Sequence, residues 1–416
     1  MASETKTIYV YDGFSRKEDA LLGRLYVDVI RGGETYSFEY DAEWLAMHGA
    51  SHMIDPSLPF YAGRQFPADG DLFGVFKDAA PDRWGRTLMN RRERQLAERE
   101  GRKPAKLHES DYMLGVFDAT RMGGLRFKTD AGGAYVSEDA DFAVPPWAKL
   151  RSLEEASRNY ENEDGGDEWK WLNQLIQPGS SLGGARPKAS VSDEKGYLWI
   201  AKFPSRHDEN DTGAWEKVAH DLATECGLNT PEARLEKFSK YGSTFLTKRF
   251  DRDAGRRIHY ASSMTLLGKK DGASAQDGTS YLDIAGFIRA YGASPKDDLR
   301  ELWRRIVFSM AISNTDDHLR NHAFILTAKG WKLSPLFDVN PEPYGNELAL
   351  NVNESSNSIS TELAIGVAAK FGIESNEAAK MASEIIGTVN AGWEKAAQGY
   401  DLSRTQIENM RPAFSL

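Results

Sequence analysis

The sequence contains only one cysteine, Cys226, so a disulfide within the chain is excluded. Cys226 belongs to an apolar helical stripe, where we expect a small buried side chain. No run of eighteen apolar residues occurs, which argues against a membrane-spanning helix. The first residues, Met1 to Lys6, also lack the apolar stretch of a signal peptide. These absences fit a reducing compartment, and we expect a cytoplasmic protein without a membrane partner.

A surplus of basic residues is absent as well. The 52 Lys and Arg residues are outnumbered by 62 Asp and Glu residues, which gives a net charge of −10 at pH 7. Because a broad phosphate-binding surface needs excess positive charge, this composition argues against sequence-independent nucleic-acid binding. Five arginines do lie close together in one segment, namely Arg83, Arg86, Arg91, Arg92 and Arg94. They form either a local basic patch or the solvated face of a helix.

The length of 416 residues exceeds the size of an ordinary single core, so two or three packed units are expected. Residues 6–40 alternate apolar and polar side chains around Gly32-Gly33, which predicts strands and a hairpin. Residues 82–99 and 299–310 have helical periodicity. We therefore predict an α+β fold with a mixed N-terminal subdomain (1–140), a strand-rich part (141–250) and a mainly helical part (251–416).

The most informative stretch runs from Ser313 to Asn321 and is followed by Leu336-Phe337-Asp338. An Asp with an Asn five residues later has the spacing of the catalytic loop of protein kinases. In such loops the Asp accepts a hydroxyl proton, while the Asn and a later Asp bind Mg²⁺ beside the phosphates of ATP. Asp316, Asn321 and Asp338 have these identities in this order. The alternative is a loop whose short polar side chains cap backbone groups.

Three features upstream favour a nucleotide site. The strand-like segment 196–203 places Lys202 on the same face as Leu198 and Ile200, where an ammonium group needs an anion or an exit to water. A helical stripe follows, and Glu216 beside it has the place of the carboxylate that pairs with such a Lys in kinases. The glycine-containing segment before the strand, residues 178–188, allows backbone N–H groups to approach phosphate oxygens. A plain turn would use the same glycines.

Three other chemistries match the sequence less well. Residues 179–183 fit the G-x-S-x-G pattern of hydrolases, with Ser181 as nucleophile, but that motif requires a strand before it and a helix after it. His318 and His322 stand four apart as in zinc proteases, but the general-base Glu is missing. No Gly-Lys-Ser/Thr occurs where a P-loop would need it.

Taken together, the chain resembles the HipA family of serine/threonine kinases, which are toxins of bacterial toxin–antitoxin pairs. The resemblance covers essentially the whole chain. It is carried by five segments, namely residues 74–86, 183–188, 248–252, 314–321 and 335–338. It implies a bilobal kinase-like fold and the cofactors ATP and Mg²⁺.

The resemblance also assigns roles to individual residues. It implies that Asp316 is the catalytic base, that Asn321 and Asp338 are metal ligands, and that Glu216 forms a structural ion pair. It further implies autophosphorylation at Ser181, with Ser180 as the second candidate. The ATP-binding residues it implies are Gly183, Gly184, Ala185, Arg186, Pro187, Lys188, Lys202, Lys248, Arg249, Phe250, His318, Asn321, Phe337 and Asp338.

The resemblance implies two protein partners. One is a HipB-like helix-turn-helix antitoxin, through which the chain would meet DNA only indirectly. The other is a protein substrate of translation, which is an aminoacyl-tRNA synthetase in family members. A different function stays open: the chain is an interaction protein that docks the antitoxin in transcriptional autoregulation and has little kinase activity.

Overall fold

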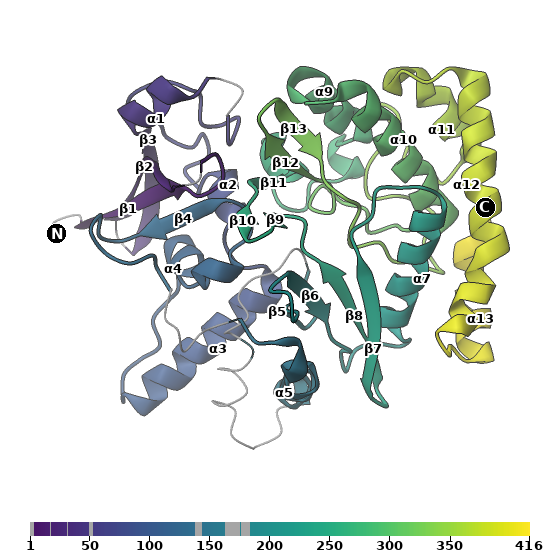
Figure 1. Cartoon of the computed structure of the whole chain (residues 1–416), viewed down its shortest axis with the longest axis horizontal. Coiled ribbons are helices and arrows are strands. Elements are labelled where there is room, and N and C mark those ends of the chain that lie inside the picture. The colour runs from purple at the N-terminus through teal and green to yellow at the C-terminus, as the bar shows by residue number, and fades with distance from the viewer. Residues whose placement is uncertain are drawn as a thin grey trace. The chain divides into compact units, whose positions relative to one another are not determined.

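The computed structural model describes residues 4–16, 18–30, 32–49, 53–137, 144–162, 175 and 184–416. The chain divides into two compact units, each treated by itself below. Unit 1 consists of residues 1–206 and 248–261, and unit 2 consists of residues 207–247 and 262–416. Strands and helices occur in both units (Figure 1), which confirms the predicted α+β class. The predicted division at residues 140 and 250 stays a prediction.

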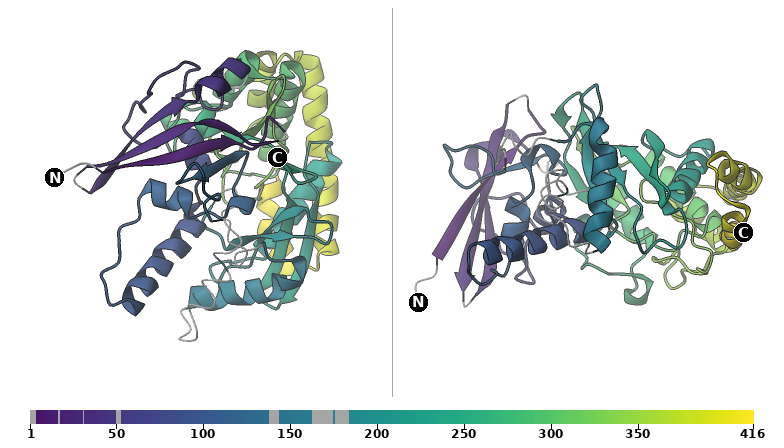
Figure 2. Two further views of the ribbon diagram at one scale, coloured as in Figure 1. Left: turned by 60° about the vertical axis from the view of Figure 1, so that its left-hand side comes forward. Right: turned by 90° about the horizontal axis from the view of Figure 1, so that it is seen from below.

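The N-terminal part of unit 1 is an antiparallel sheet, whose long strands are purple in Figure 2. Its strand order is β3-β2-β1-β4. Its strands are β1 (Glu4–Asp12), β2 (Ala20–Ile30), β3 (Gly33–Tyr40) and β4 (Leu125–Lys128). The predicted hairpin is confirmed, because Ile30 pairs with Gly33 and Gly32 has a φ of +78°, which glycine adopts without steric cost. Ile8 and Val10 are buried at alternate positions, as the period of two predicted.

The helices of unit 1 are α1 (Ala42–Met47), α2 (Gly74–Asp78), α3 (Arg83–Arg99), α4 (Glu109–Leu114) and α5 (Leu150–Asn162). Helix α3 confirms the predicted helix at 82–99. It begins after Asp82, whose Oδ1 accepts a hydrogen bond of 2.9 Å from the Gly85 N–H and so caps the helix. Trp84 and Leu88 of α3 form a buried cluster with Ala156 and Tyr160 of α5.

Two short antiparallel pairs complete unit 1. The first joins β5 (Lys188–Ser192) to β6 (Leu198–Lys202), and the second joins β9 (Arg252–Asp253) to β10 (Arg256–Arg257). The turn between β5 and β6 is held by Asp193, which accepts hydrogen bonds from the Tyr197 N–H and the Trp199 indole N–H at 2.9 and 3.0 Å. These bonds help to fix the register in which Lys188 lies opposite Lys202. The chain then passes through β11 (Tyr260–Ser262) into unit 2.

Unit 2 is mainly helical. Its strands form two antiparallel pairs, β7 (Ala233–Ser239) with β8 (Gly242–Lys248) and β12 (Ala323–Thr327) with β13 (Gly330–Leu333). Its helices are α7 (Thr212–Glu225), α8 (Ser263–Leu266), α9 (Tyr281–Tyr291), α10 (Pro295–Ala311), α11 (Thr361–Val367), α12 (Ser375–Gly399) and α13 (Arg404–Met410). Helix α12 packs against both α7 and α10, and Figure 1 shows each of these two helices beside α12.

Helix α10 leads into the predicted catalytic loop. Pro295 at its first position and Asp297 and Asp298 in its first turn are residues that favour a helix start. Buried apolar side chains recur along it at the predicted spacing, including Leu302, Trp303 and Ile306. Each such side chain contributes about 1.5–3 kcal/mol when it is fully buried. The helix is therefore a rigid support for the loop that begins at its end.

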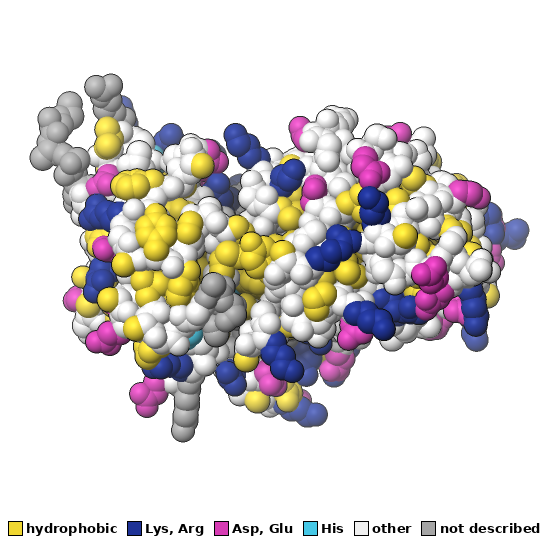
Figure 3. All heavy atoms as spheres, turned by 90° about the horizontal axis from the view of Figure 1, so that it is seen from above, with side chains coloured by type: hydrophobic (Ala, Val, Ile, Leu, Met, Phe, Trp, Pro, Cys, Tyr) yellow, Lys and Arg dark blue, Asp and Glu magenta, His cyan; other side chains and the backbone are white. Residues whose placement is uncertain are grey.

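Two properties of the described surface bear on function. On the face drawn in Figure 3, basic and acidic side chains are interspersed. Within the described ranges, no helix has the combination of length and apolar character that a membrane span requires.

Candidate nucleotide-binding and catalytic site

The predicted site residues fall into two sets, one in each unit. Unit 1 contains the glycine segment, Lys202 and residues 248–250, whereas unit 2 contains Glu216, Asp316, His318, Asn321, Phe337 and Asp338. Of the glycine segment, the structure describes Gly184 to Lys188. Gly183 and the predicted autophosphorylation residues Ser181 and Ser180 lie outside the described residues.

The clearest feature of the unit 1 set is a pair of lysines. Lys188 and Lys202 are direct partners across the β5–β6 ladder, so their side chains leave the same face of this strand pair. Both residues are buried, at 3% and 5% exposure. Two like charges directly opposite each other repel, and burial increases that repulsion. Such an arrangement is favourable where anionic groups approach both ammonium groups.

Asp82 provides an anion for one of these lysines. Its Oδ2 lies 3.1 Å from Lys188 Nζ, and the indole N–H of Trp84 donates to the Lys188 carbonyl at 3.2 Å. Gly184 is next to this ammonium group, because a Cβ built on it would lie 3.4 Å from Lys188 Nζ, and its φ is +84°. The start of α3 therefore holds the lysine that follows the glycine segment. Sequence reasoning placed Asp82 at a helix start but did not find this contact.

The predicted hinge, residues 248–250, is attached firmly within unit 1. The Arg249 N–H donates to the Leu198 carbonyl of β6 at 2.9 Å, and Lys248 Nζ lies 3.6 Å from the centre of the Tyr197 ring. Arg249 is buried, and its guanidinium binds both carboxylate oxygens of Asp251 at 2.9 and 2.7 Å. A role of Arg249 in ATP binding would therefore have to use its backbone, since its side chain is committed to Asp251.

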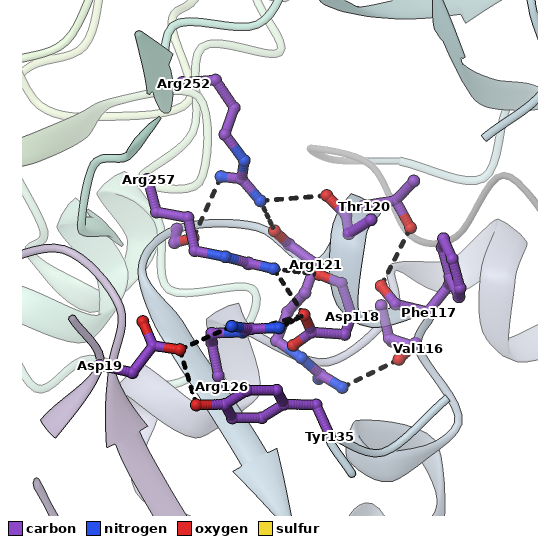
Figure 4. Close-up of polar contacts among 12 residues, drawn as sticks. Asp19, Val116, Phe117, Asp118, Thr120, Arg121, Arg126, Tyr135, Arg252 and Arg257 are labelled. Carbon is purple, nitrogen blue, oxygen red and sulfur yellow. Dashed lines mark hydrogen bonds and ion pairs between the residues drawn. The ribbon is translucent and has the colours of Figure 1, made fainter. Parts of the chain in front are cut away.

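Arginines of the hinge and of the residues just after it bind the loop at 116–123, and part of this arginine cluster is drawn in Figure 4. Arg249 donates to the Thr120 carbonyl at 2.6 Å, and Arg252 donates to the Arg121 carbonyl at 2.7 Å. Asp251 accepts from the Gly123 N–H at 2.8 Å. Burial alone would raise the pKa of Asp251, but attraction to Arg249 and Arg252 outweighs it and lowers the pKa to about 2. The carboxylate is thus charged at neutral pH and holds the segment in place.

A second carboxylate, Asp118, lies between two further arginines (Figure 4). Its Oδ2 accepts from Arg126 at 2.6 Å and from Arg257 at 2.8 Å. Arg121 is fully buried and donates to backbone carbonyls, including that of Met113 at 2.6 Å. Burial lowers the pKa of Arg121 to about 9, which still leaves it charged at pH 7. The cluster therefore joins residues that are more than a hundred positions apart in the sequence.

The basic segment of the sequence is not a free patch. Arg86 of α3 forms two hydrogen bonds with Glu109, at 2.6 and 2.7 Å. Arg91 lies over the ring of Tyr160, with 4.8 Å between Cζ and the ring centre. These two arginines serve packing within unit 1, which favours the structural interpretation of this segment.

In unit 2 the predicted catalytic loop is a series of turns between α10 and β12. Asp316 has an exposed side chain, at 89%, which an incoming hydroxyl group can reach. Its carbonyl accepts hydrogen bonds from the His318 N–H at 2.9 Å and from Asn321 Nδ2 at 3.0 Å. His318 Nε2 lies 4.0 Å from Asp316 Oδ1. The spacing of five residues thus brings the Asn side chain back to the Asp backbone.

The segment that contains Asp338 lies against this loop. The Asn340 N–H donates to Asn314 Oδ1 at 3.3 Å. Gly345 touches Thr315 so closely that a Cβ on this glycine would lie 2.3 Å from Thr315 Cγ2. These contacts place the segment that follows Asp338 beside the segment that precedes Asp316. Asp338 itself has a φ of +58°, a conformation that costs energy for a side-chain-bearing residue and is found disproportionately at functional sites.

The donor atoms present in unit 2 fit a Mg²⁺ ion. Asn321 Oδ1 is buried and accepts no hydrogen bond from any described residue, while Nδ2 of the same side chain donates to the Asp316 carbonyl. A buried amide oxygen without a partner is costly, and a hard cation would satisfy it. Among the described residues, no group of three His, Cys, Asp or Glu side chains could hold a metal by itself. Mg²⁺ is commonly held by one or two protein ligands together with phosphates, so a cluster of three ligand side chains is not required.

The remaining predicted residues of unit 2 are Phe337 and Glu216, and both are buried. Glu216 belongs to α7, as its place in the helical stripe predicted. The predicted ion pair between Lys202 and Glu216 would join the two units and stays a prediction. Cys226 is half-buried at the end of α7, and burial raises the pKa of its thiol to about 11.

Sequence reasoning missed the surroundings of Asp317, the residue after the predicted base. Its carboxylate is buried and accepts hydrogen bonds from the Tyr281 hydroxyl at 2.7 Å and the Ser309 hydroxyl at 3.2 Å. His322 Nε2 lies 2.9 Å from the other carboxylate oxygen. Burial alone would raise the pKa of Asp317, but His322 and the two hydroxyl groups outweigh it, so the pKa is lowered. The sequence shows two adjacent aspartates and gives no sign of which one turns inward.

Comparison with known proteins identifies the family of this chain. The family model described as the HipA-like C-terminal domain matches residues 180–393, and the model described as the HipA N-terminal domain matches residues 18–103. The first match alone covers more than half of the chain, and the two together span all the predicted site residues. The chain therefore belongs to the HipA family.

The individual proteins that resemble this chain share 30% or less of its residues in the matched regions. A curated protein of Haemophilus influenzae, described as a candidate kinase, is 30% identical over an alignment of 190 residues, and the match covers 40% of this chain and 54% of that protein. The chain thus spans about half the length of this relative. The HipA protein of Shewanella oneidensis, solved in a complex with HipB and operator DNA, is 17% identical with a TM-score of 0.69. That comparison covers 98% of this chain and 96% of the other, and it shows a shared fold.

The Helicobacter pylori proinflammatory kinase CtkA is also similar, at 16% identity. Its comparison covers 55% of this chain and 94% of that protein. The TM-score of 0.38 is too low for a structural argument.

Proposed function

We propose that this protein is an ATP- and Mg²⁺-dependent protein serine/threonine kinase of the HipA toxin type. The observation that carries the proposal is Asn321 Oδ1, a buried and unsatisfied oxygen in a loop whose Asp316 is exposed. That combination suits a metal-assisted transfer to a hydroxyl group. Lys188 opposite Lys202 adds support, since the two ammonium groups suit a polyphosphate.

Each residue has a definite task in this proposal. Asp316 accepts the proton of the acceptor hydroxyl, and Asn321 and Asp338 would hold Mg²⁺. The ion would neutralise charge on the phosphates when it is bound. Gly183 to Lys188 and Lys202 bind the phosphates, residues 248–250 flank the adenine, and His318 and Phe337 lie beside the nucleotide. Most of the rate enhancement then comes from positioning and charge.

The substrate and the partner are part of the proposal. As in the family, the acceptor is a protein of translation, to be sought first among the aminoacyl-tRNA synthetases, and the protein acts in the cytoplasm. The chain also phosphorylates itself at Ser181 or Ser180. A HipB-like antitoxin is the proposed partner, because the Shewanella HipA structure contains HipB and operator DNA.

A second candidate function is supported by that same complex. In this second function, the present chain serves mainly to dock the antitoxin and to regulate transcription, and it has little kinase activity. Phosphate transfer from labelled ATP by the purified chain separates the two functions. The kinase proposal predicts transfer that is lost in Asp316→Asn and in Asp338→Asn and that is abolished by EDTA. No transfer by the folded chain, together with tight binding to its antitoxin, would favour the docking function.

The substrate is best sought by comparing phosphoproteomes after expression of the parent chain and of the Asp316→Asn variant. The proposal predicts that a synthetase peptide carries phosphate only with the parent chain. Equal phosphorylation with both chains would contradict the assignment of that protein as a substrate.

A further inference from the structure

The residue that follows the proposed base is anchored in the interior of unit 2. Asp317 is 1% exposed, and a polar group lies within 3.2 Å of each of its carboxylate oxygens. One oxygen accepts hydrogen bonds from Tyr281 at 2.7 Å and Ser309 at 3.2 Å, and the other lies 2.9 Å from His322 Nε2. A buried carboxylate without such partners would be very costly. The network therefore favours a single position for Asp317.

The three partners come from different elements. Tyr281 is the first residue of α9, Ser309 lies in the last turn of α10, and His322 precedes β12. The ring of Tyr281 also meets the ring of His322 edge to face, with 5.6 Å between their centres. Asp317 thus ties the loop to two helices and to the start of a strand. None of these contacts uses an atom that the proposed reaction requires.

Both ends of this network adjoin residues of the proposed reaction. Asp317 follows Asp316, and His322 follows Asn321. Asp316 and Asp317 point in opposite directions, since their side chains are 89% and 2% exposed. The amide of Asn321 then returns to the Asp316 carbonyl at 3.0 Å. Displacement of the inward side chains would therefore displace both outward functional groups.

We propose that Asp317 and His322 are positioning residues, which hold Asp316 and Asn321 in the geometry needed for phosphoryl transfer. This inference rests on the proposed kinase function. A misplacement of about 1 Å reduces an enzymatic rate by about 100-fold. The expected effect of losing the network is therefore on kcat and not on the binding of the nucleotide base.

The test compares Asp317→Asn with Asp298→Asn in the full chain. Asp298 is a matched control, because it is also a buried aspartate of unit 2 and accepts a hydrogen bond from the Leu333 N–H at 3.1 Å. It lies eleven residues before Ser309 on α10, which is about 16 Å along the helix axis. Both variants lose a buried charge, but only one of them loses the contact with the loop.

The expected result is a selective loss of turnover. Asp317→Asn should lower kcat by about 100-fold, and His322→Gln should do the same, while the dissociation constant for ADP without Mg²⁺ stays within about twofold. Combining the two substitutions should add little, since they disrupt one unit. Tyr281→Phe keeps the carboxylate and His322, so it folds more readily and should lower kcat by less than about tenfold. Asp298→Asn should leave kcat unchanged.

A second measurement does not depend on activity. Hydrogen exchange of a peptide that spans residues 313–322 reports the backbone bonds from His318 to Asp316 and from Asn321 to His318. Exchange should be faster in Asp317→Asn and unchanged in Asp298→Asn. Unchanged exchange in Asp317→Asn, or unchanged kcat in a folded Asp317→Asn chain, would overturn the positioning role. If the parent chain transfers no phosphate but the exchange result holds, the kinase proposal fails and the loop anchor remains.

Discussion

The ammonium group of Lys188 lies 3.1 Å from the carboxylate of Asp82, and both side chains are nearly inaccessible to water, at 3% and 8% exposure. Asp82 belongs to the region matched by the HipA N-terminal domain, whereas Lys188 belongs to the region matched by the C-terminal domain. The N-terminal region thus supplies the counter-ion of a lysine that we expect to bind phosphates. This contact has consequences for stability that can be measured.

Asp82→Asn is expected to lower the free energy of unfolding by about 3 kcal/mol, because Lys188 would remain buried without its counter-ion. Asn still caps α3, so the helix start is retained. Thermal unfolding of the variant and of the double variant Asp82→Asn/Lys188→Met checks this explanation. Removing both charges should restore most of the lost stability. A double variant no more stable than Asp82→Asn would show that the ion pair is not the cause.

Asp118 and Asp19 allow a matched test of how burial affects the ion pairs of the arginine cluster. Both accept a hydrogen bond of 2.6 Å from Arg126, but Asp118 is 3% exposed and Asp19 is 27% exposed. Asp118→Asn should cost about 3–5 kcal/mol, because two partly buried arginines lose the buried carboxylate that they share. Asp19→Asn should cost at most about 1 kcal/mol, as for other partly solvated pairs. Chemical unfolding of both variants measures the difference, and equal losses would contradict the role assigned to burial.

The stability of unit 1 should depend on pH through His259. Burial lowers the pKa of this imidazole from 6.5 to about 4, and its ring stacks on Phe14 at 4.6 Å. Between these pH values the unfolded chain binds a proton that the folded chain does not. The contribution of neutral His259 to the free energy of unfolding is therefore fully present above pH 6.5 and is lost as the pH falls toward 4. The total loss is on the order of 3 kcal/mol.

Thermal unfolding of the parent chain and of His259→Phe at pH 7 and pH 4.5 checks this expectation. The parent chain should lose more stability than the variant between the two pH values, since the variant has no group that titrates at this position. Equal losses would rule out His259 as the source of the acid sensitivity.

Phosphorylation at Ser181 is expected to inhibit the proposed kinase, because Ser181 precedes the proposed phosphate-binding segment by two residues in the sequence and a dianionic group there would repel ATP. Ser181→Asp should weaken ATP binding by about tenfold, which corresponds to roughly 1.4 kcal/mol of repulsion. A nucleotide titration of Ser181→Asp and Ser181→Asn separates charge from size, since the two side chains have similar volumes. Equal affinities for ATP in these two variants would refute inhibition by charge.

The sequence predicted the local features of the site better than its long-range ones. Asp316, Asn321 and Asp338 were predicted as site residues from their identities, order and spacing, and the Asn321 amide does return to the Asp316 carbonyl. The Asp82–Lys188 pair joins positions more than a hundred residues apart, so no local pattern contains it. The same holds for the contact between Arg249 and Thr120. The inward turn of Asp317 depends on Tyr281 and His322, and two adjacent aspartates give no sign of it.

The central claim is that Asp316 is the base of a phosphoryl transfer from ATP. The most direct test is the intact mass of the purified chain after incubation with ATP and Mg²⁺, because autophosphorylation requires no knowledge of the substrate. The parent chain and Asp298→Asn should gain phosphate, and Asp316→Asn should gain none. Phosphate on Asp316→Asn at the rate of the parent chain, or none on the parent chain purified without phosphate, would contradict the account.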